Sequence, residues 1–409
     1  MGEGCFLAGL AENACVRAQV VTVTSENSLY PKENLQSGFP WEEFRFNAAG
    51  TNLEIKFDTN LLTQGETDFE ADTIGAVPGG RWVTVAGTPT VEAAPAAGHG
   101  ANSLRFNATA ESNQIDLSLT VGRDYGINFS LYSNSSENID VFVLNLETGK
   151  WWAGGVWNAS KTVFQTHTAA SWSDYTLNIL AETRAWGYVG GYARHRFIIE
   201  KRTGTGAAYI DDISIFPYCS IASLHNYRDI PDGLSVLAQS SADNSAWTTR
   251  GTLPSGRRYR NYITFSVQAQ RWWKFLISGI TYFAPTIGQP VLGQRHTFIT
   301  KPSWGMVTAR EMPKGGREDL PISLAAAPRY RFEMEWESQY SSYQQIADEM
   351  LGASNFGDEP IVVVPDIVDA EIVYGRGASM ASISARLDPI DTMLYQLTIQ
   401  DDAYPVVVT

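Results

Sequence analysis

The chain has 409 residues, a length that suits about two to four domains with hydrophobic cores of their own. Hydrophobic residues make up 44% and charged residues 18% of the sequence, which excludes a disordered chain. The net charge of −14 argues against nucleic-acid binding, because that function needs a basic surface.

The three cysteines, Cys5, Cys15 and Cys219, are too few for a disulfide framework and match no zinc-binding spacing. We interpret them as reduced thiols. The first ten residues lack a basic region and a long apolar run, so they do not resemble a secretory signal. No apolar run approaches the roughly 20 residues of a membrane helix. We therefore expect a protein made in a cytoplasm, without a signal peptide and without membrane insertion.

The N-terminal part predicts only two strands, at residues 18–24 and 52–57, where apolar and polar residues alternate. Between them lies the segment 25–35, which reads S-x-N-x-x-Y-P-x-x-N-L and is followed by Trp41. Two strands cannot bury a core, so this part needs strands from elsewhere in the chain.

Residues 67–216 contain short alternating runs, for example at 114–119 and 125–131, separated by Gly, Asn and Ser. This pattern predicts a sandwich of two sheets. The stretch opens with Thr-Asp-Phe-Glu at 67–70 and closes with the pair Asp211 and Asp212. In this order it resembles the jelly-roll carbohydrate-binding modules that are attached to many polysaccharide-degrading enzymes.

The jelly-roll resemblance implies a structural Ca²⁺ held by Glu70 and Asp212, with backbone carbonyls completing the site and Asp68 able to replace either carboxylate. The alternative is that Asp211 and Asp212 satisfy turn amides at a strand end. Their side chains point to opposite faces of the strand, so they cannot form a glycosidase acid pair.

Tryptophan rings supply the candidate sugar contacts, because an exposed ring face can stack on a sugar. The alternative for each ring is packing in the core or at its rim. Trp151 and Trp152 are neighbours on a predicted strand, so one of them must face outward or into an interface. The candidates are Trp82, Trp151, Trp152, Trp157, Trp172 and Trp186, and we choose Trp82, Trp151, Trp152 and Trp157.

After this stretch, residues 235–248 predict a strand followed by a polar turn and Trp247, residues 271–279 predict another strand, and residues 287–293 close the set. They resemble the v-x-x-S-x-D-x-x-W strand, the W-x-x-x-x-I-x-G strand and the I-G-x-x-x-L-G end of discoidin-type β-sandwiches, and they follow the early S-x-N-x-x-Y-P motif in the same order. The chain resembles such a sandwich split in two, with 1–64 and 217–295 as its halves and 65–216 inserted as the jelly-roll module.

The remaining residues, 296–409, predict an assembly domain. Residues 304–320 are rich in Gly, Pro and charge and suggest an extended arm or long hairpin. We expect strands at 329–336, 360–364, 369–374, 379–387 and 394–400, and a helix at 341–351. The layout resembles the ring-forming domain of distal tail and baseplate proteins of tailed phages, which implies a small α+β or β-barrel-like fold.

The sequence contains no H-E-x-x-H, G-x-S-x-G or P-loop motif, and we expect no enzymatic activity. His195 lies between two arginines, and we interpret it as part of a solvated strand face. The fold expected is mainly β: two sandwiches and the assembly domain. The function expected is a tail-tip or baseplate protein of the virion that contacts itself in a ring, other tail proteins (tube, hub, fibres) and a host-surface glycan. The alternative is a non-catalytic carbohydrate-binding protein or an accessory module of a glycan-degrading enzyme.

Overall fold

A computed structural model describes residues 5–8, 12–38, 42–96, 99–134, 138–181, 192–225, 234–254, 262–279 and 284–297, and the strands 303–309, 329–339, 360–364, 373–379 and 392–401. The mainly β class is confirmed. The helices of this part of the chain are short: α1 (Ala14–Arg17), α2 (Gln64–Thr67) and the 3₁₀ helix η1 (Lys32–Gln36). None of them is long and apolar enough to cross a membrane. The helix expected at 341–351 lies outside the described residues.

One sandwich is formed between residues 61 and 217 and encloses a core that includes Phe69, Phe129 and Phe197. Its strands alternate as the sequence predicted, with apolar side chains inward at every second position. The first sheet has the order β12-β11-β10-β15-β8-β5, with β13 also on β10. Its strands are β5 (Val83–Ala86), β8 (Ser112–Thr120), β10 (Asn138–Asn145), β11 (Trp151–Ala153), β12 (Val156–Asn158), β13 (Gln165–His167) and β15 (Tyr192–Thr203). The second sheet, β14-β9-β16-β7-β6, consists of β6 (Thr90–Ala93), β7 (Asn102–Phe106), β9 (Asp124–Ser133), β14 (Ser173–Leu180) and β16 (Ala208–Pro217).

A second sandwich takes strands from both sides of the first one in sequence. Its core includes Phe57, Cys219 and Trp273, which come from distant parts of the chain. The chain leaves it after β4 and returns at β17. Its five-stranded sheet is β19 (Thr248–Leu253), β18 (Ser235–Ser241), β21 (Trp272–Ser278), β4 (Asn52–Asp58) and β2 (Val20–Val23), in that order. Opposite lie β20 (Tyr262–Gln268), β17 (Cys219–His225) and β23 (Gln289–Gly293), and the pair β22 (Thr286–Ile287) and β3 (Phe44–Arg45).

The C-terminal strands form a seven-stranded antiparallel sheet that also contains the N-terminal strand β1. The order is β24 (His296–Thr297), β1 (Cys5–Ala8), β27 (Pro360–Val364), β28 (Val373–Ser379), β29 (Thr392–Asp401), β26 (Arg329–Gln339) and β25 (Ser303–Ala309). All four residues of β1 pair with β27. This pairing departs from the expectation that residues 1–64 lie with the discoidin-like sandwich, and no local pattern signals a contact across about 355 residues of sequence separation.

Two further details concern the strands and the arm expected in the C-terminal part. Of the strand expected at 369–374, residues 373 and 374 belong to β28, and residues 369–372 lie outside the described residues, as do residues 380–387 of the strand expected at 379–387. The arm expected at 304–320 begins as β25, which pairs in register with β26 as a hairpin does. Residues 310–320 are not among those described.

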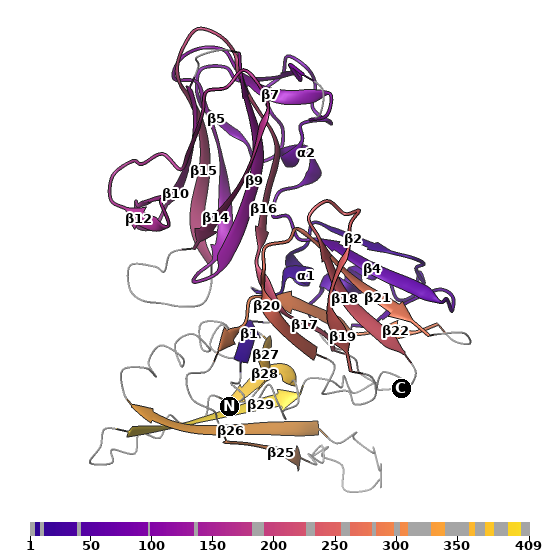
Figure 1. Cartoon of the computed structure of the whole chain (residues 1–409). Helices are drawn as coiled ribbons and strands as arrows, with labels where there is room; N and C mark the ends of the chain where they lie inside the picture. The colour runs from indigo at the N-terminus through magenta and orange to yellow at the C-terminus, as the bar shows by residue number, and fades with distance from the viewer. Residues whose placement is uncertain are drawn as a thin grey trace, which may run out of the picture.

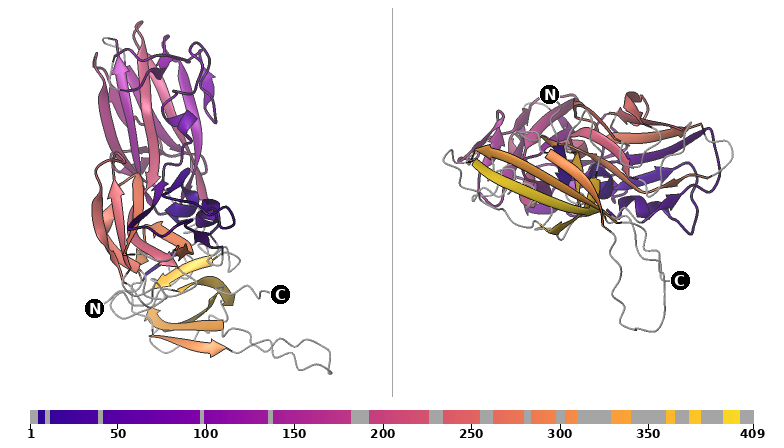
Figure 2. Two further views of the ribbon diagram at one scale, coloured as in Figure 1. Left: turned by 90° about the vertical axis from the view of Figure 1, so that its right-hand side faces the viewer. Right: turned by 90° about the horizontal axis from the view of Figure 1, so that it is seen from below.

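The three parts lie in sequence along the molecule: the inserted sandwich is at one end, the seven-stranded sheet is at the other, and the split sandwich lies between them (Figures 1 and 2). Among the described strands, both the first, β1, and the last, β29, belong to this terminal sheet.

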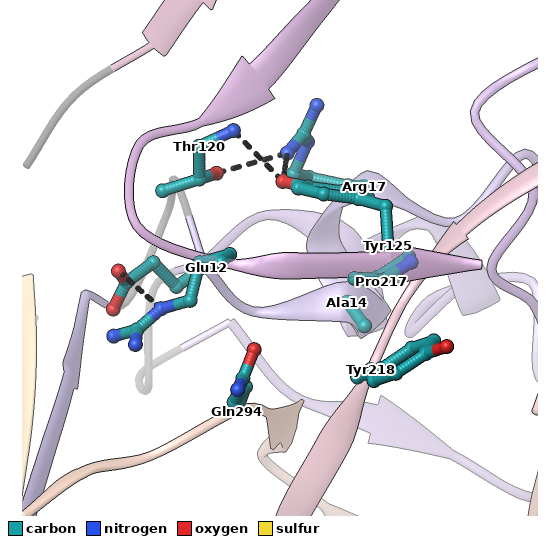
Figure 3. A pocket seen from close by; sticks show the side chains of 9 residues that line it. Glu12, Ala14, Arg17, Thr120, Tyr125, Pro217, Tyr218 and Gln294 are labelled. Carbon is teal, nitrogen blue, oxygen red and sulfur yellow. Dashed lines mark hydrogen bonds and ion pairs between the residues drawn. The ribbon is translucent and has the colours of Figure 1, made fainter. Parts of the chain in front are cut away.

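Polar contacts join the two sandwiches (Figure 3). Arg17 of α1 donates to the Thr120 hydroxyl at 3.1 Å and to the Ser118 carbonyl at 2.6 Å. Glu12 and Arg123 form a buried ion pair of 2.8 Å. The cavity beside them is about 10 Å³, which leaves room for at most one water molecule. This junction therefore holds the sandwiches together and is too small to be a ligand site.

Candidate functional site

The outer face of the β14-β9-β16-β7-β6 sheet has an unusual polar character. Leu104, Phe106 and the apolar residues of β9 and β16 face the core, so the alternate residues of these strands face outward. Four of these outward side chains have a buried polar atom without a hydrogen-bond partner: Ser103 Oγ, Arg105 Nε, Asn128 Oδ1 and Asp211 Oδ2. Native proteins leave few such atoms unpaired, and their concentration on one sheet face indicates a place prepared for a polar ligand or ion.

Aromatic rings border this polar face. Tyr132 of β9 and Tyr209 of β16 are cross-strand partners, with ring centroids 5.9 Å apart in edge-to-face geometry. Trp172 lies 5.6 Å from Tyr132 and 4.6 Å from the ring of His99. The Trp172 indole N–H donates to the Ala96 carbonyl, which fixes the ring. Aromatic rings beside hydrogen-bonding groups are the combination that binds sugars, since the rings cover C–H faces and the polar groups bond hydroxyls.

The imidazole of His99 links the aromatic border to acidic residues. Its Nδ1 lies 2.8 Å from Asp212 Oδ2, and its Nε2 lies 3.6 Å from Asp174 Oδ1. Asp174 of β14 also accepts a hydrogen bond of 2.7 Å from Ser130 of β9. Ser130 is the cross-strand partner of both Asp174 and Asp211, because β9 lies between β14 and β16. The loop histidine is thus positioned by two carboxylates and one indole ring.

Four carboxyl groups gather at this end of the sheet. The pKa of Asp211 is raised to about 9: burial is the main cause, the hydrogen bond from the Asp212 backbone N–H opposes it, and the charges of Asp212, Glu70 and Asp68 add to it. Burial also raises the pKa of Asp68, with the charges of Glu70 and Asp212 adding to it. Asp211 is only 1% exposed. A cation here would relieve this repulsion.

The backbone at this cluster is specialised. Phe69 and Asp212 adopt left-handed conformations, with φ of 55° and 52°, which non-glycine residues rarely adopt. Gly100 also has a positive φ, and a Cβ there would lie 2.0 Å from Glu70 Oε1. Glu70 Oε1 accepts hydrogen bonds from the backbone N–H groups of Ala101 and Asn102, at 2.6 and 3.0 Å. The loop that carries His99 is therefore fastened to Glu70.

The cluster fits a calcium ion in charge and in donor type, because Ca²⁺ prefers carboxylate and carbonyl oxygens. As the side chains lie, no group of three or more His, Cys, Asp or Glu residues in the described part of the chain could hold a metal ion. Backbone carbonyls would have to contribute, as the sequence prediction assumed. Of the predicted ligands, Glu70 already accepts two amide hydrogen bonds and Asp212 contacts His99. The oxygen without a partner belongs to Asp211, which the sequence prediction did not choose.

Two of the chosen tryptophans are not available to a ligand. Trp82 is 7% exposed, packs against Phe69 and Phe197, and donates its indole N–H to the Glu66 carbonyl. Trp152 is 4% exposed, and its N–H is bonded to the Asn178 carbonyl. The assignment of these two rings as sugar contacts was wrong, because their ring faces complete the hydrophobic core.

The other two chosen tryptophans lie away from the polar face. Trp151 is half-buried on the outer side of the opposite sheet, 5.9 Å from the Phe142 ring centroid. Trp157, on the edge strand β12, packs against Trp152 and donates to the Leu180 carbonyl. Both remain predictions. Trp186 lies outside the described residues.

His195 corrects another expectation. The flanking arginines suggested a solvated strand face, yet the His195 side chain is fully buried and lies 5.4 Å from the Trp157 ring. On β15 the arginines point to the outer face and His195 to the inner one, as strand alternation requires.

No protein-family model matches the sequence, and no curated protein matches it. Similar solved structures include the CBM22-1 xylan-binding domain of Xyn10C from Paenibacillus barcinonensis, with 18% identity over 37% of this chain and 91% of that one, and a TM-score of 0.26. TmCBM61, solved with β-1,4-galactotriose, has 16% identity over 39% of this chain and 98% of that one, with a TM-score of 0.25.

The enzymatically active domain of tailspike protein 4 from bacteriophage CBA120 has 13% identity over 39% of this chain, with a TM-score of 0.27. The match spans only 21% of the tailspike chain. Identities this low do not transfer a ligand or an activity to this chain.

Sequence reasoning missed most of the polar face. Tyr132, Tyr209 and Arg105 are ordinary strand residues, and only register brings them together. Trp172 was among the candidates but was not chosen. One signal was available for His99: it stands in a short loop between two glycines, Gly98 and Gly100, before a strand. Such loops often carry functional side chains.

Proposed function

We propose that this chain is a structural protein of the tail tip or baseplate of a tailed phage, and that its inserted sandwich binds carbohydrate. The observation that carries the binding proposal is the outer face of the β14-β9-β16-β7-β6 sheet. There, unpartnered buried polar atoms on Ser103, Arg105 and Asn128 lie on the same face as the rings of Tyr132 and Tyr209. Sugar hydroxyls can satisfy polar atoms of both kinds, donors and acceptors, within one ligand.

The arrangement of the chain supports a structural role. The N-terminal strand β1 is built into the same sheet as the C-terminal strands, so both ends of the described chain belong to one terminal sheet. The inserted sandwich lies at the opposite end of the molecule (Figure 1). A protein that assembles through one end and displays the other would have this arrangement, and the C-terminal sequence resembles ring-forming tail domains.

A non-catalytic role is part of the proposal. Hydrolysis of a glycosidic bond needs two carboxyl groups on either side of that bond. Asp211, whose pKa is raised to about 9, is buried and cannot reach a substrate. Asp212 and Asp174 are both engaged by His99. These contacts support binding rather than bond cleavage.

We also propose that Ca²⁺ strengthens the inserted sandwich at the carboxylate cluster. Glu70 and Asp212 would hold the ion together with backbone carbonyls, with Asp68 as an alternative ligand and Asp211 supplying its unpartnered oxygen. The ion would neutralise the cluster and tie the loops around α2 and His99 to strand β16.

A glycan array probed with the full-length protein, followed by calorimetry on the best ligand, tests carbohydrate binding. We expect Tyr132→Ala and Trp172→Ala each to weaken binding at least about tenfold, the loss typical of removing a stacked ring. Trp151→Ala, on the opposite sheet, tests the competing sequence prediction for that ring: if the polar face is the site, this variant binds as the wild type does. Loss of binding in Trp151→Ala with none in Tyr132→Ala would refute the assignment of the face.

Electron microscopy of phage particles labelled with an antibody against this chain tests the structural role. Label at the tail tip in several copies per particle is the expected result. A strictly monomeric full-length protein that copurifies with a glycan-degrading enzyme and is absent from particles would support the alternative, an accessory carbohydrate-binding protein.

A further inference from the structure

Two lysines lie side by side on the outer face of the split sandwich. Lys56 of β4 and Lys274 of β21 are directly opposed in the antiparallel register. Like charges in such positions repel each other and destabilise a sheet. Lys274 is also well buried, with its side chain only 8% exposed, while that of Lys56 is 31% exposed. Both the burial of Lys274 and the closeness of the two ammonium groups are unfavourable for folding, so stability does not explain why two lysines occupy these positions.

One carboxylate serves both lysines. Glu54 Oε2 lies 3.0 Å from Lys56 Nζ, and Glu54 Oε1 lies 2.9 Å from Lys274 Nζ. Burial would raise the pKa of Glu54, but the hydrogen bonds and charges of the two lysines lower it, so it stays ionised. Each ammonium has three N–H donors, and Glu54 cannot occupy them all. The group keeps a surplus of one positive charge in a chain of net charge −14.

Trp247 covers this pair. Its ring centroid lies 4.4 Å from Lys274 Nζ and 5.7 Å from Lys56 Nζ. The turn before it is held by Asp243, whose carboxylate accepts hydrogen bonds from Ser241, Ser245 and the Ala246 backbone. These hydrogen bonds lower the pKa of Asp243. A fixed turn holds the ring in place before any ligand arrives, which reduces the entropy lost on binding.

We propose that Lys56, Lys274 and Trp247 form a second saccharide site, one that selects sugars carrying an acidic group. The carboxylate or phosphate of the ligand would pair with the two ammonium groups, and the sugar ring would lie against the indole. A neutral sugar would leave the surplus charge uncompensated, so the acidic group determines selectivity. This site is on a different sandwich from the polar face and does not depend on it.

Calorimetry with the full-length protein tests the proposal. The probes are an oligoglucuronate, a glycerol-phosphate oligomer and a neutral cello-oligosaccharide of matched length. We expect binding of at least one acidic probe, weakened at least tenfold by Lys56→Gln and retained in Lys56→Arg. Comparison of the two acidic probes identifies carboxylate or phosphate as the preferred group, and either outcome supports the site. Added salt should weaken the interaction.

Glu54→Gln gives the sharpest test, because a merely structural role for these residues predicts the opposite result. Removing the competing carboxylate should tighten binding of the acidic probe severalfold, even though it loosens the sheet. The proposal is overturned if no acidic probe binds, if the neutral probe binds equally well, or if Glu54→Gln weakens binding. Tyr132→Ala should leave this binding unchanged, so failure here is distinguishable from failure of the carbohydrate-binding face of the inserted sandwich.

Discussion

Asp211 offers the most direct test of the carboxylate cluster. Its pKa is raised from 3.8 to about 9, chiefly by burial and further by the charges of Asp212, Glu70 and Asp68. The folded protein therefore keeps this proton at pH values where the unfolded chain has released it. The contribution of this group to stability is complete below pH 3.8 and is lost progressively as the pH rises towards about 9.

The size of this effect follows from the shift. Neutral pH lies about 3 units above the pKa of this carboxyl in the unfolded chain, where it is ionised, but below its pKa in the folded protein, where it keeps its proton. Ionisation therefore favours the unfolded chain by at most about 4 kcal/mol. Asp211→Asn keeps the side-chain shape and the acceptor for the Asp212 backbone N–H, bonded at 2.8 Å in the wild type, but cannot ionise. We expect the variant to be about 2 kcal/mol more stable than the wild type at neutral pH, since local relaxation reduces the upper limit.

Urea unfolding of both proteins in chelator, at about pH 5, 7 and 9, measures this difference. The gap between variant and wild type should widen as the pH rises. Addition of Ca²⁺ should stabilise the wild type at neutral pH and have a much smaller effect on Asp211→Asn. The control is Asp116→Asn, which removes an exposed carboxylate paired with Arg196 on the other sheet, away from the cluster. Equal stability of Asp211→Asn and wild type at every pH would refute the reasoning.

Three further predictions concern stability. Trp82→Ala should lower the free energy of unfolding by about 3–5 kcal/mol, because it empties a core site, whereas Trp151→Ala should cost about 1 kcal/mol or less; thermal unfolding distinguishes them. Glu66→Gln should lower the free energy of unfolding by about 2–3 kcal/mol above pH 4.5. Burial would raise the pKa of Glu66, but hydrogen bonds from the Arg81 side chain and from the backbone of Thr63 and Arg81 lower it to about 2. Urea titrations should therefore show a smaller cost as the pH falls towards that value. Arg17→Ala should speed backbone hydrogen exchange at Ser118 and Thr120, which lie at the junction between the sandwiches, and leave exchange in both cores unchanged. Unchanged rates at Ser118 and Thr120 would show that the other contacts hold the junction together without Arg17.

Local pattern predicted much of the fold. The strands around residues 52–57, 114–119 and 125–131 appear as β4, β8 and β9, because alternation reports which side of a strand is buried. Alternation does not describe Asp211 and Asp212: a β-bulge follows Asp211, Asp212 has a left-handed backbone, and the inward positions on either side are Ile210 and Ile213. Pattern alone could not place β1, because a four-residue strand carries too little information to name its partner.

The candidate site was harder to predict, since it depends on register between strands. Tyr132 and Tyr209 are 77 residues apart in sequence and are neighbours only because β9 pairs with β16 in one register. A shift of one residue in this register would put the two rings on opposite faces of the sheet. The choice of Trp82 and Trp152 as sugar contacts failed for a different reason. Burying a large ring in a core stabilises the fold more than leaving it exposed, and both rings are part of the core.

Both candidate binding faces lie on the outer sides of sheets whose inner sides form the cores. Tyr132 and Trp247 are half-buried, whereas the neighbouring inward residues Phe129 and Phe275 are fully packed. Ligand contacts can therefore change without altering the residues that hold each sandwich together, and the Arg17 contacts at the junction are independent of both faces. The terminal sheet, which includes β1, adds a third surface that neither face uses. Under the proposed function, changes at the two outer faces would leave the terminal sheet and both cores intact.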